Sequence, residues 1–507
     1  MIYGVPNAAI ALDIARKCSS YSDLMGGTLA EYEFIQWLLN QVDNPMLSYE
    51  LQPVSVLVWR DRFSRIVHGN NEYRALGMPL TLGGSGRGKL TMDLNDAEGK
   101  VLLTDFPEDM DDAKYVYIKA MEKGALAVIF RDKYPGVARR IVVTATPDYS
   151  WDRAPPPTMP ALVVSREVGD ELSKHVGEDV EYISDSETRL GTGYNLIMSL
   201  EGNREEVVVL AVHHDHWLTG FADDCLGVGL GAQLLLNALR RRGDLKRGLS
   251  FISFTAEEAG NPGFASLYWA YGSTRYVEYL SRRGLLNNVY AVLNLDVIGR
   301  QFVIHTSEDL SMQLSQLVSA QWELPKPYFD SLNFEMNGIP SMTVSSLDHY
   351  WDVYHTDKDI EEKANAEDIE SSLKVSQQLL DYLLVNDLTP SPYISVLNRD
   401  VISVGLGIEL REDWETYRLV KYLLSKYIVE YRRDGSVKTV YTNSILSYVR
   451  RFININDINQ VPLKVEEMGT GRVIMDTSTI RNLRQLSEYI TQVIESLTEE
   501  MSINLVT

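Results

Sequence analysis

The strongest constraint on the fold is a regular alternation of strand-type and helix-type segments in the middle of the chain. Apolar runs of strand length recur between residues 194 and 344, and amphipathic helical patterns separate or follow them. The predicted strands are Tyr194–Leu200, Val207–Val212, Leu249–Thr255, Val289–Leu295 and Ile339–Val344, and the predicted helices are Leu226–Arg242, Leu310–Gln321 and Ala366–Leu384. The alternation predicts an α/β fold with a wound, mostly parallel sheet and helices on both faces. Because such sheets bind ligands at the carboxyl ends of their strands, we expect a site there.

Composition excludes several classes of protein. The chain has 507 residues, of which 45% are hydrophobic and 23% are charged, which indicates a globular protein of several domains. Its net charge of -22 comes without a basic stripe, so we expect no nucleic-acid partner and no membrane partner. No apolar run reaches the length of about 18 residues that suggests a membrane span. The only cysteines, Cys18 and Cys225, are too few for a disulfide framework, so we expect a cytoplasmic protein in which Cys225 is a packing residue.

A second, smaller α/β module is predicted before the main alternation. Its strands and helices are expected at residues 99–106, 112–123, 125–130, 160–164 and 168–175. The glycine-rich stretch from Gly83 to Lys89 nearly matches a phosphate-binding loop, but Leu90 stands where magnesium chemistry needs Ser or Thr. We therefore interpret residues 82–88 as a flexible hinge into the module.

The C-terminal part of the chain is predicted to be mainly helical. Strong helical patterns cover Trp414–Arg432 and Thr479–Met501, with an Asp434–Gly435 turn in the weaker connection between them. The predicted domain boundaries are therefore 1–80, 81–187, 188–390 and 391–507, in which the first segment contributes the N-terminal part of the third domain.

Residues of the types that bind metals follow the predicted strands. His213 and Asp215 come directly after one strand, and Asp223 stands ten residues after His213 at the start of a helix. A histidine at a strand end and an aspartate at a helix start can converge on one metal ion. Taken alone, this motif is equally well explained as a polar turn between strand and helix.

Further ligand-type residues stand at the ends of later strands. Glu257 and Glu258 end the strand 249–255, and Asp296 ends the strand 289–295 inside an apolar frame, where an unpaired carboxylate would be costly. Tyr354 and His355 precede the last long helix. From spacing alone His305 and His349 remain rival ligands, and His214 and His216 offer additional imidazoles.

The ordered set resembles the co-catalytic zinc aminopeptidase family that includes glutamate carboxypeptidases and transferrin receptors. The family pattern runs His-x-Asp, Asp-x-x-x-Gly, Glu-Glu, Asn-x-Asp and Tyr-His-Thr. The matching segments are His213–Asp215, Asp223–Gly227, Glu257–Glu258, Asn294–Asp296 and Tyr354–Thr356, with Gly338–Pro340 before the last of them. The resemblance covers roughly residues 1–390. It implies a phosphorylase/hydrolase-like mixed sheet, with residues 81–187 as an inserted protease-associated domain and residues 391–507 as a helical domain that forms a homodimer.

The resemblance also implies a ligand set for two Zn²⁺ ions. One ion would be held by His213 and Asp296, the other by Glu258 and His355, and Asp223 would bridge them. Three carboxylates and a bridging hydroxide balance the charge of the two ions, and nitrogen and carboxylate oxygen are normal zinc ligands.

The remaining motif residues receive roles around the metals. The resemblance implies that the Asp215 carboxylate accepts the His213 N–H and that Glu257 moves the proton of the bridging water. Tyr354 would donate to the developing oxyanion. Asp224 would lie at a helix start, where the helix dipole favours a carboxylate.

The function implied is hydrolysis of N-terminal residues from short peptides by a zinc-dependent exopeptidase. The loop Gly260–Phe264 departs from the Gly-Leu-Leu-Gly-Ser of the family near the site. The segment Met342–Ser346, which aligns with an arginine patch of glutamate carboxypeptidases, has no arginine, so a preference for C-terminal glutamate is not expected. The alternatives are a carboxypeptidase or dipeptidase, an aminoacyl cyclase with one metal, and a non-catalytic receptor or scaffold relative.

Overall fold

The structure is a computed structural model that describes residues 8–389, apart from 109, 111, 146–154, 264–268, 307, 324, 327 and 336, together with residues 429–431 and 437–439. The chain divides into two compact units. The first comprises Met1–Val303, Tyr328–Asn333 and Thr343–Val385, and the second comprises Ile304–Pro327, Phe334–Met342 and Asn386–Thr507. The residues discussed as sites below all belong to the first unit.

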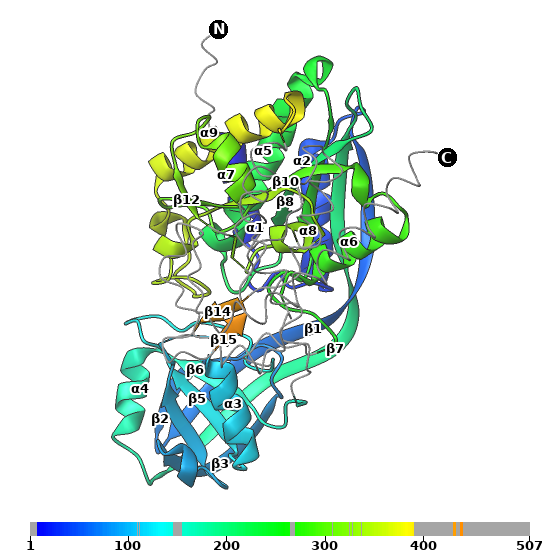
Figure 1. The fold of residues 1–507 in the computed structure, drawn as a ribbon. Helices are drawn as coiled ribbons and strands as arrows, with labels where there is room; N and C mark the ends of the chain where they lie inside the picture. Colours follow the sequence, from blue (N-terminus) through cyan, green and yellow to red (C-terminus); the bar gives the residue numbers. More distant parts are fainter. Residues whose placement is uncertain are drawn as a thin grey trace, which may run out of the picture. The chain divides into compact units, whose positions relative to one another are not determined.

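A mixed sheet forms the centre of the first unit (Figure 1). Its strands follow the order β1 (Ser48–His68), β7 (Asp179–Leu200), β9 (Gly248–Phe254), β8 (Val207–His213), β10 (Val289–Leu295) and β13 (Ser341–Ser345). Strand β8 runs parallel to β9 and β10, whereas β7 runs antiparallel to β1 and β9. The predicted parallel strands are therefore present, but a long antiparallel pair borders them.

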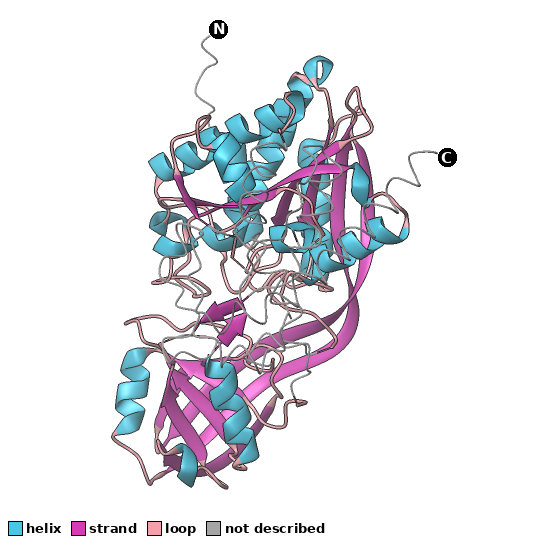
Figure 2. Cartoon of the chain, viewed as in Figure 1, coloured by secondary structure: helices cyan, strands magenta, loops and turns pink. Residues whose placement is uncertain are grey.

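Helices cover the sheet on both sides (Figure 2). Helices α5 (Leu226–Arg240) and α9 (Ala366–Val385) pack against β8 and β10, while α2 (Leu29–Val42) and α6 (Tyr271–Arg282) pack against β7. Helix α1 (Ala9–Ser19) lies on α5. This approach requires a glycine, because a Cβ on Gly229 would lie 2.2 Å from the carbonyl oxygen of Ala11.

Strands β1 and β7 continue together beyond the main sheet into an inserted lobe, here defined as residues 60–190 (Figure 1). The other strands of the lobe are β2 (Asn71–Gly77), β3 (Gly84–Thr91), β4 (Val101–Asp105), β5 (Ala127–Arg131) and β6 (Ala161–Val164). Their order, β1-β2-β6-β5-β4-β3-β7, closes on itself through the β1–β7 pairing. Each strand of the ring is therefore paired on both sides for at least two residues, which limits edge-to-edge aggregation.

The lobe sheet is covered on both faces. Side chains alternate along β5, so that Phe130 packs in the same cluster as Tyr117 of α3 (Asp112–Glu122), and Ile129 packs with Leu172 of α4 (Arg166–Ser173). The cluster around Tyr117 also contains Trp217, which follows the histidine-rich segment. Apolar packing therefore connects the lobe with the segment that carries the predicted ligands.

Most predicted elements are found within a few residues, but the predicted hinge is wrong. Residues 84–91 form strand β3, which pairs antiparallel with β7. The glycines that suggested a hinge permit close packing instead, because a Cβ on Gly86 would lie 2.5 Å from the Tyr182 hydroxyl. The helix predicted at 310–321 is also shorter. It is α7 (Glu308–Leu314), and Gln321 already belongs to the short strand β12 (Gln321–Glu323).

The remaining described elements are short. In the second unit β12 neighbours β11 (Val303–Thr306), and β14 (Val429–Tyr431) pairs with β15 (Val437–Thr439) on either side of the predicted turn. Helix α8 covers Ser331–Glu335. The helix predicted over 414–432 is wrong at its end, since residues 429–431 form a strand. The rest of that helix and the whole of 479–501 lie outside the described residues, so the dimerisation domain stays a prediction.

The interpretation of the cysteines needs correction. Cys18 at the end of α1 and Cys225 before α5 form a disulfide, with their Cα atoms 5.5 Å apart and a sequence separation of 207. Only the packing of α1 on α5 brings these residues together, so spacing could not reveal the bond. No helix among the described residues has the length and hydrophobicity that crossing a membrane requires.

Candidate metal centre

Three parallel strands end at one edge of the main sheet, and ligand-type residues stand at each end. His213 is the last residue of β8, the pair Glu257 and Glu258 follows β9, and Asp296 follows β10. All four side chains are buried. The motif residues that are far apart in the sequence are thus brought together by strand order, as the sequence predicted.

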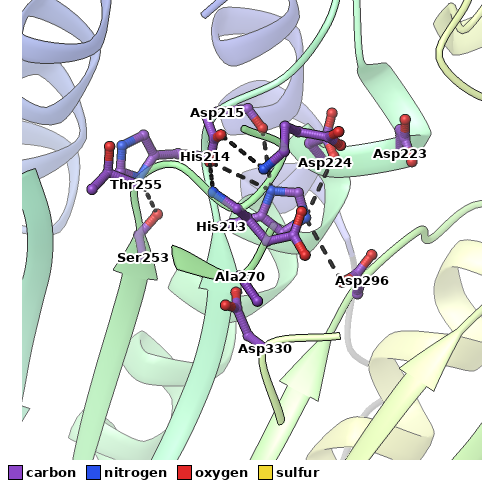
Figure 3. A network of polar contacts seen from close by, with 12 residues as sticks. His213, His214, Asp215, Asp223, Asp224, Ser253, Thr255, Ala270, Asp296 and Asp330 are labelled. Carbon is purple, nitrogen blue, oxygen red and sulfur yellow. Dashed lines mark hydrogen bonds and ion pairs between the residues drawn. The ribbon is translucent and has the colours of Figure 1, made fainter. Parts of the chain in front are cut away.

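The imidazole of His213 lies among carboxylates (Figure 3). Its Nε2 is 3.4 Å from Asp224 Oδ1 and 3.8 Å from Asp296 Oδ2. Ligand atoms of His213, Asp224 and Glu258 all lie within 4.8 Å of one another. Neither oxygen of the Asp224 carboxylate has a hydrogen-bond partner among the described residues. Asp224 therefore faces the centre itself, a position more central than the helix-start role expected for it.

His355 joins the centre from a different segment. Its Nε2 lies 3.1 Å and 3.0 Å from the two carboxylate oxygens of Glu258 and 3.4 Å from Asp223 Oδ2. Its Nδ1 lies 3.0 Å from the carbonyl oxygen of Arg140. If Nδ1 carries the proton and donates to this carbonyl, Nε2 is left free to face the carboxylates, which is the usual arrangement of a metal-binding histidine.

The contact with Arg140 comes from the inserted lobe. The Arg140 N–H donates to the His355 carbonyl over 3.0 Å, and the buried Arg140 guanidinium pairs with Asp23 and Asp61. The neighbouring Arg139 donates to the carbonyl of Trp351 over 3.0 Å. The lobe thus supports the loop that carries His355.

Asp215 has a different contact from the expected one. Its two carboxylate oxygens accept the backbone N–H groups of Glu257 and Glu258, each over 3.0 Å. The His213 Nδ1 instead lies 3.2 Å from the Asp215 backbone oxygen and 3.9 Å from the nearer carboxylate oxygen. The Asp215 side chain therefore holds the turn of the glutamate pair, because two N–H groups at the end of β9 have no strand partner.

The segment of Asp223 is held by an aspartate that the sequence did not single out. The carboxylate of Asp359 accepts the N–H groups of Ala222 and Asp223 over 2.9 and 3.0 Å, and the Tyr350 hydroxyl donates to it over 2.7 Å. Asp359 is 1% exposed. Its position four residues after His355 in an acidic segment gave no signal that would separate it from surface carboxylates.

Three of the seven described non-glycine residues with a positive φ lie at these segments. Ala256, Val297 and His355 have positive φ values of 53°, 51° and 57°, although none is glycine. Such conformations cost about 1–3 kcal/mol each and persist where the surroundings fix them, often at functional sites. Each lies in or directly beside a residue of the centre.

Comparison with protein-family models identifies this region. The model described as "Peptidase family M28" matches residues 195–380, which contain His213, the glutamate pair, Asp296 and His355. This chain carries an M28 peptidase domain. The match confirms the co-catalytic zinc aminopeptidase family predicted from the motifs and supports a metallopeptidase, whereas the protease-associated identity of the lobe stays a prediction.

Solved structures share the fold of this chain. A zinc aminopeptidase from Bacillus subtilis has 17% identity and a TM-score of 0.61, covering 76% of this chain and 97% of that one. A peptidase M28 precursor from Shewanella amazonensis has 18% identity and a TM-score of 0.60, with 75% and 93% covered. An aminopeptidase from Aneurinibacillus sp. strain AM-1 has 18% identity and a TM-score of 0.54, with 75% and 95% covered. No curated protein matches the sequence significantly.

Burial perturbs the titration of the M28 centre. Burial raises the pKa values of Asp223, Asp224 and Glu257, and neighbouring carboxylates raise them further. For Glu258 burial acts in the same direction, but the contact with His355 outweighs it and lowers the pKa. Burial alone would lower the pKa of His213, yet Glu257 and Asp224 raise it above its ordinary value. Carboxyl groups this close and this buried repel one another, so the donor set fits divalent cations.

A second network missed by the sequence supports the Glu257 loop. The Ala270 N–H donates to the Glu257 carbonyl over 2.7 Å. The Ser273 hydroxyl lies within hydrogen-bonding distance of both the Ala270 carbonyl and the Asp330 carboxylate, and its one proton can be donated to either of them. Burial raises the pKa of Asp330 to about 7. The other carboxylate oxygen of Asp330 is buried without a hydrogen-bond partner in the described structure. Asp330 thus adds potential negative charge beside the M28 centre.

Neither rival histidine belongs to a described group of ligand-type residues that contains His213 or His355. His349 is exposed, and His305 belongs to the second unit. His214 is engaged by Ser253 and Glu31, 2.9 Å from Ser253 Oγ and 3.2 Å from Glu31 Oε1. Of the additional imidazoles, His214 is therefore a buried structural group and not a free ligand.

Proposed function

We propose that the M28 domain is a zinc-dependent aminopeptidase that removes N-terminal residues from short peptides. The observation that carries the proposal is the convergence of two histidines and several buried carboxylates at the strand ends, with Glu257 among them. The fold shared with zinc aminopeptidases supports the same class of reaction.

We propose two Zn²⁺ ions, one at His213 and Asp296 and the other at Glu258 and His355, with Asp223 between them. The contacts of Asp223 and Glu258 with His355 support this grouping. When bound, zinc would polarise the scissile carbonyl and make a water molecule nucleophilic near neutral pH.

Side chains of the protein would then transfer the proton, position the proton acceptor and stabilise the oxyanion. Glu257 would accept the proton of the attacking water and pass it to the leaving amine. Asp215 would fix the position of Glu257 through its backbone N–H. Tyr354, whose ring stacks on His355 with centroids 3.7 Å apart, would donate to the oxyanion.

Charge favours a substrate with a free amino terminus over one read by its carboxylate. The carboxyl groups of Asp223, Asp224, Glu257, Glu258, Asp296 and Asp330 outnumber the positive charges of two Zn²⁺ ions. The arginines that the lobe brings toward the His355 loop, Arg139 and Arg140, are paired with Asp132, Asp23 and Asp61. An ammonium group is therefore attracted to the centre, whereas a terminal carboxylate would need a cation that these arginines do not offer.

The lobe and the C-terminal segment complete the proposal. We expect the lobe to act as a protease-associated lid that restricts access to short peptides, and residues 391–507 to form a homodimer. Light scattering of the full chain at micromolar concentration tests the dimer, and a monomer would contradict it.

The test of the function is mass spectrometry of products from a mixed peptide pool. Each peptide is supplied with a free or an acetylated N-terminus, with Zn²⁺ present, to wild type, Glu257→Gln and the surface control Glu278→Gln, whose side chain is 41% exposed. Stepwise loss of N-terminal residues from free peptides only, abolished in Glu257→Gln and retained in the control, is expected. Trimming from the carboxyl end would identify a carboxypeptidase, and no cleavage by a zinc-loaded chain would favour the scaffold.

A further inference from the structure

A second group of metal-binding side chains lies in the lobe, made entirely of lobe residues. His68 is the last residue of β1, His175 follows α4, and Glu178 precedes β7. His68 Nε2 lies 2.7 Å from Glu178 Oε2, and His175 Nδ1 lies 3.6 Å from Glu178 Oε1. One ligand atom from each residue can be chosen so that all lie within 4.8 Å of one another. We propose that His68, His175 and Glu178 form a second metal site, for Zn²⁺ or a similar divalent transition metal.

The spacing suits tetrahedral zinc. Bonds of about 2.0–2.2 Å at tetrahedral angles place ligand atoms roughly 3.3 Å apart. The distances from the two Glu178 oxygens to the two imidazoles, 2.7 Å and 3.6 Å, lie on either side of this value, and the three donors lie within 4.8 Å of one another, so side-chain adjustment would bring them to a common ion. Two imidazoles and one carboxylate are an ordinary zinc ligand set, and the partial exposure of the group leaves the fourth position to water.

A carboxylate lies near the second ring nitrogen of His175, where metal-binding histidines usually have an outer acceptor, but at an ion-pair distance and not at a hydrogen-bond distance. The second ring nitrogen of His175, Nε2, lies 3.7 Å from Glu171 Oε1, and Glu171 is itself held by Lys174 over 2.6 Å. A carboxylate that accepts the other ring N–H fixes the tautomer and directs the free nitrogen to the metal. The orientation required is His175 Nδ1 toward Glu178 and Nε2–H toward Glu171.

The backbone holds the three ligands in place. The Leu90 N–H donates to the Glu178 carbonyl and the Gly177 N–H to the Leu90 carbonyl, each over 2.8 Å. The Glu178 N–H donates to the His175 carbonyl over 3.0 Å, and His68 pairs with Asn71 in the β1–β2 hairpin. The backbone at the three ligands is therefore already ordered before binding, and a metal would cross-link the end of β1, the residue after α4 and the start of β7.

A simple hydrogen bond between His68 and Glu178 is the competing explanation. It would leave His175 without a role, although the two imidazole rings lie against each other with centroids 3.9 Å apart. One metal ion can bind both rings as neutral ligands. The arrangement therefore favours the metal.

Metal content of the full chain tests the site. Four proteins are dialysed to equilibrium against buffered Zn²⁺: wild type, His68→Ala, His175→Ala and Glu178→Gln. The number of zinc ions per chain is then measured by elemental mass spectrometry. His349→Ala is the control, since it removes an exposed histidine outside the lobe. We expect each lobe variant to bind one Zn²⁺ fewer than wild type and the control to be unchanged. Equal zinc content in wild type and folded lobe variants would overturn the proposal.

Diffraction from zinc-soaked wild-type crystals, collected at the zinc absorption edge, locates the ion without any substitution and covers the case of a variant that fails to fold. An anomalous peak between His68, His175 and Glu178 supports the site. Its absence in crystals that show zinc at His213 or His355 overturns it.

Discussion

The M28 centre and the histidine group of the lobe use the same ligand types in opposite surroundings. At the centre, His213, Glu258 and Asp296 are at most 6% exposed and draw on several distant segments. In the lobe, the side chains of His68, His175 and Glu178 are 15%, 24% and 58% exposed, and two of them are three residues apart. Burial makes charge at the centre costly without metal, whereas water screens the lobe group. We therefore expect large effects of substitution at the centre and small ones in the lobe.

The sharpest test is removal of the proposed proton acceptor. Glu257→Gln keeps the shape of the side chain but cannot take a proton, so kcat should fall about 10²–10⁴-fold while zinc content stays the same. The matched change in the lobe is Glu72→Gln, whose side chain is 58% exposed and pairs only with Arg65 among the contacts described. Steady-state kinetics with an aminoacyl chromogenic substrate should show wild-type kcat for that control. A comparable loss in both variants would break the contrast.

The ion pairs of Arg140 should dominate the stability of the connection between lobe and centre. Arg140→Met leaves Asp61, whose side chain is 3% exposed, without its buried partner, which should lower the free energy of unfolding by about 3–5 kcal/mol. Denaturant unfolding followed by tryptophan fluorescence measures the change. The control is Arg62→Met, which removes exposed pairs with Asp185 and Glu187 and should have a far smaller effect. Equal losses would mean that burial does not set the strength of these pairs.

The disulfide beside the centre should stabilise the fold by about 2–4 kcal/mol. Cys18→Ala and Cys225→Ala each open the same bond, so their losses in free energy of unfolding should be equal, and the double variant should lose no more than either one. Reducing agent should lower wild type to the same level and leave the variants unchanged. Additive losses would show that the side chains act by packing and not through the bond.

The buried His216 should make the protein less stable at acidic pH. Burial lowers its pKa to about 4, whereas the unfolded chain takes the proton near 6.5. Between these values the unfolded state binds more protons, so stability is full above pH 6.5 and is lost as pH falls toward 4, by up to roughly 3 kcal/mol. His216→Gln retains a donor for the Cys18 carbonyl, which His216 Nε2 contacts at 3.3 Å, but has no titration. Between pH 7 and 4 the free energy of unfolding should fall less with decreasing pH in the variant than in wild type. The same pH dependence in both proteins would contradict the assignment.

The sequence predicted the parallel strands and the ligand residues because both are local signals. Apolar runs identify β8, β9 and β10, and strand ends in such a sheet must share one edge, so His213, the glutamate pair and Asp296 could be placed together. The glycine-rich β3 was missed because its residues have low strand propensity and are selected for close approach to Tyr182.

The sequence by itself indicated a metallopeptidase, because its ligand-type motifs follow the order of the zinc aminopeptidase family and the M28 family model matches residues 195–380. Only the tertiary structure decided which atoms position the ligand residues. Asp215 supports the glutamate turn, Asp359 supports Asp223, and Arg140 of the lobe fixes His355 through its backbone. The disulfide and the His68–His175–Glu178 group likewise join segments that no periodicity connects. The physical reason is that the hydrophobic pattern depends on residues that are close in sequence. Hydrogen bonds, ion pairs and metal ligands depend on distances that exist only after folding.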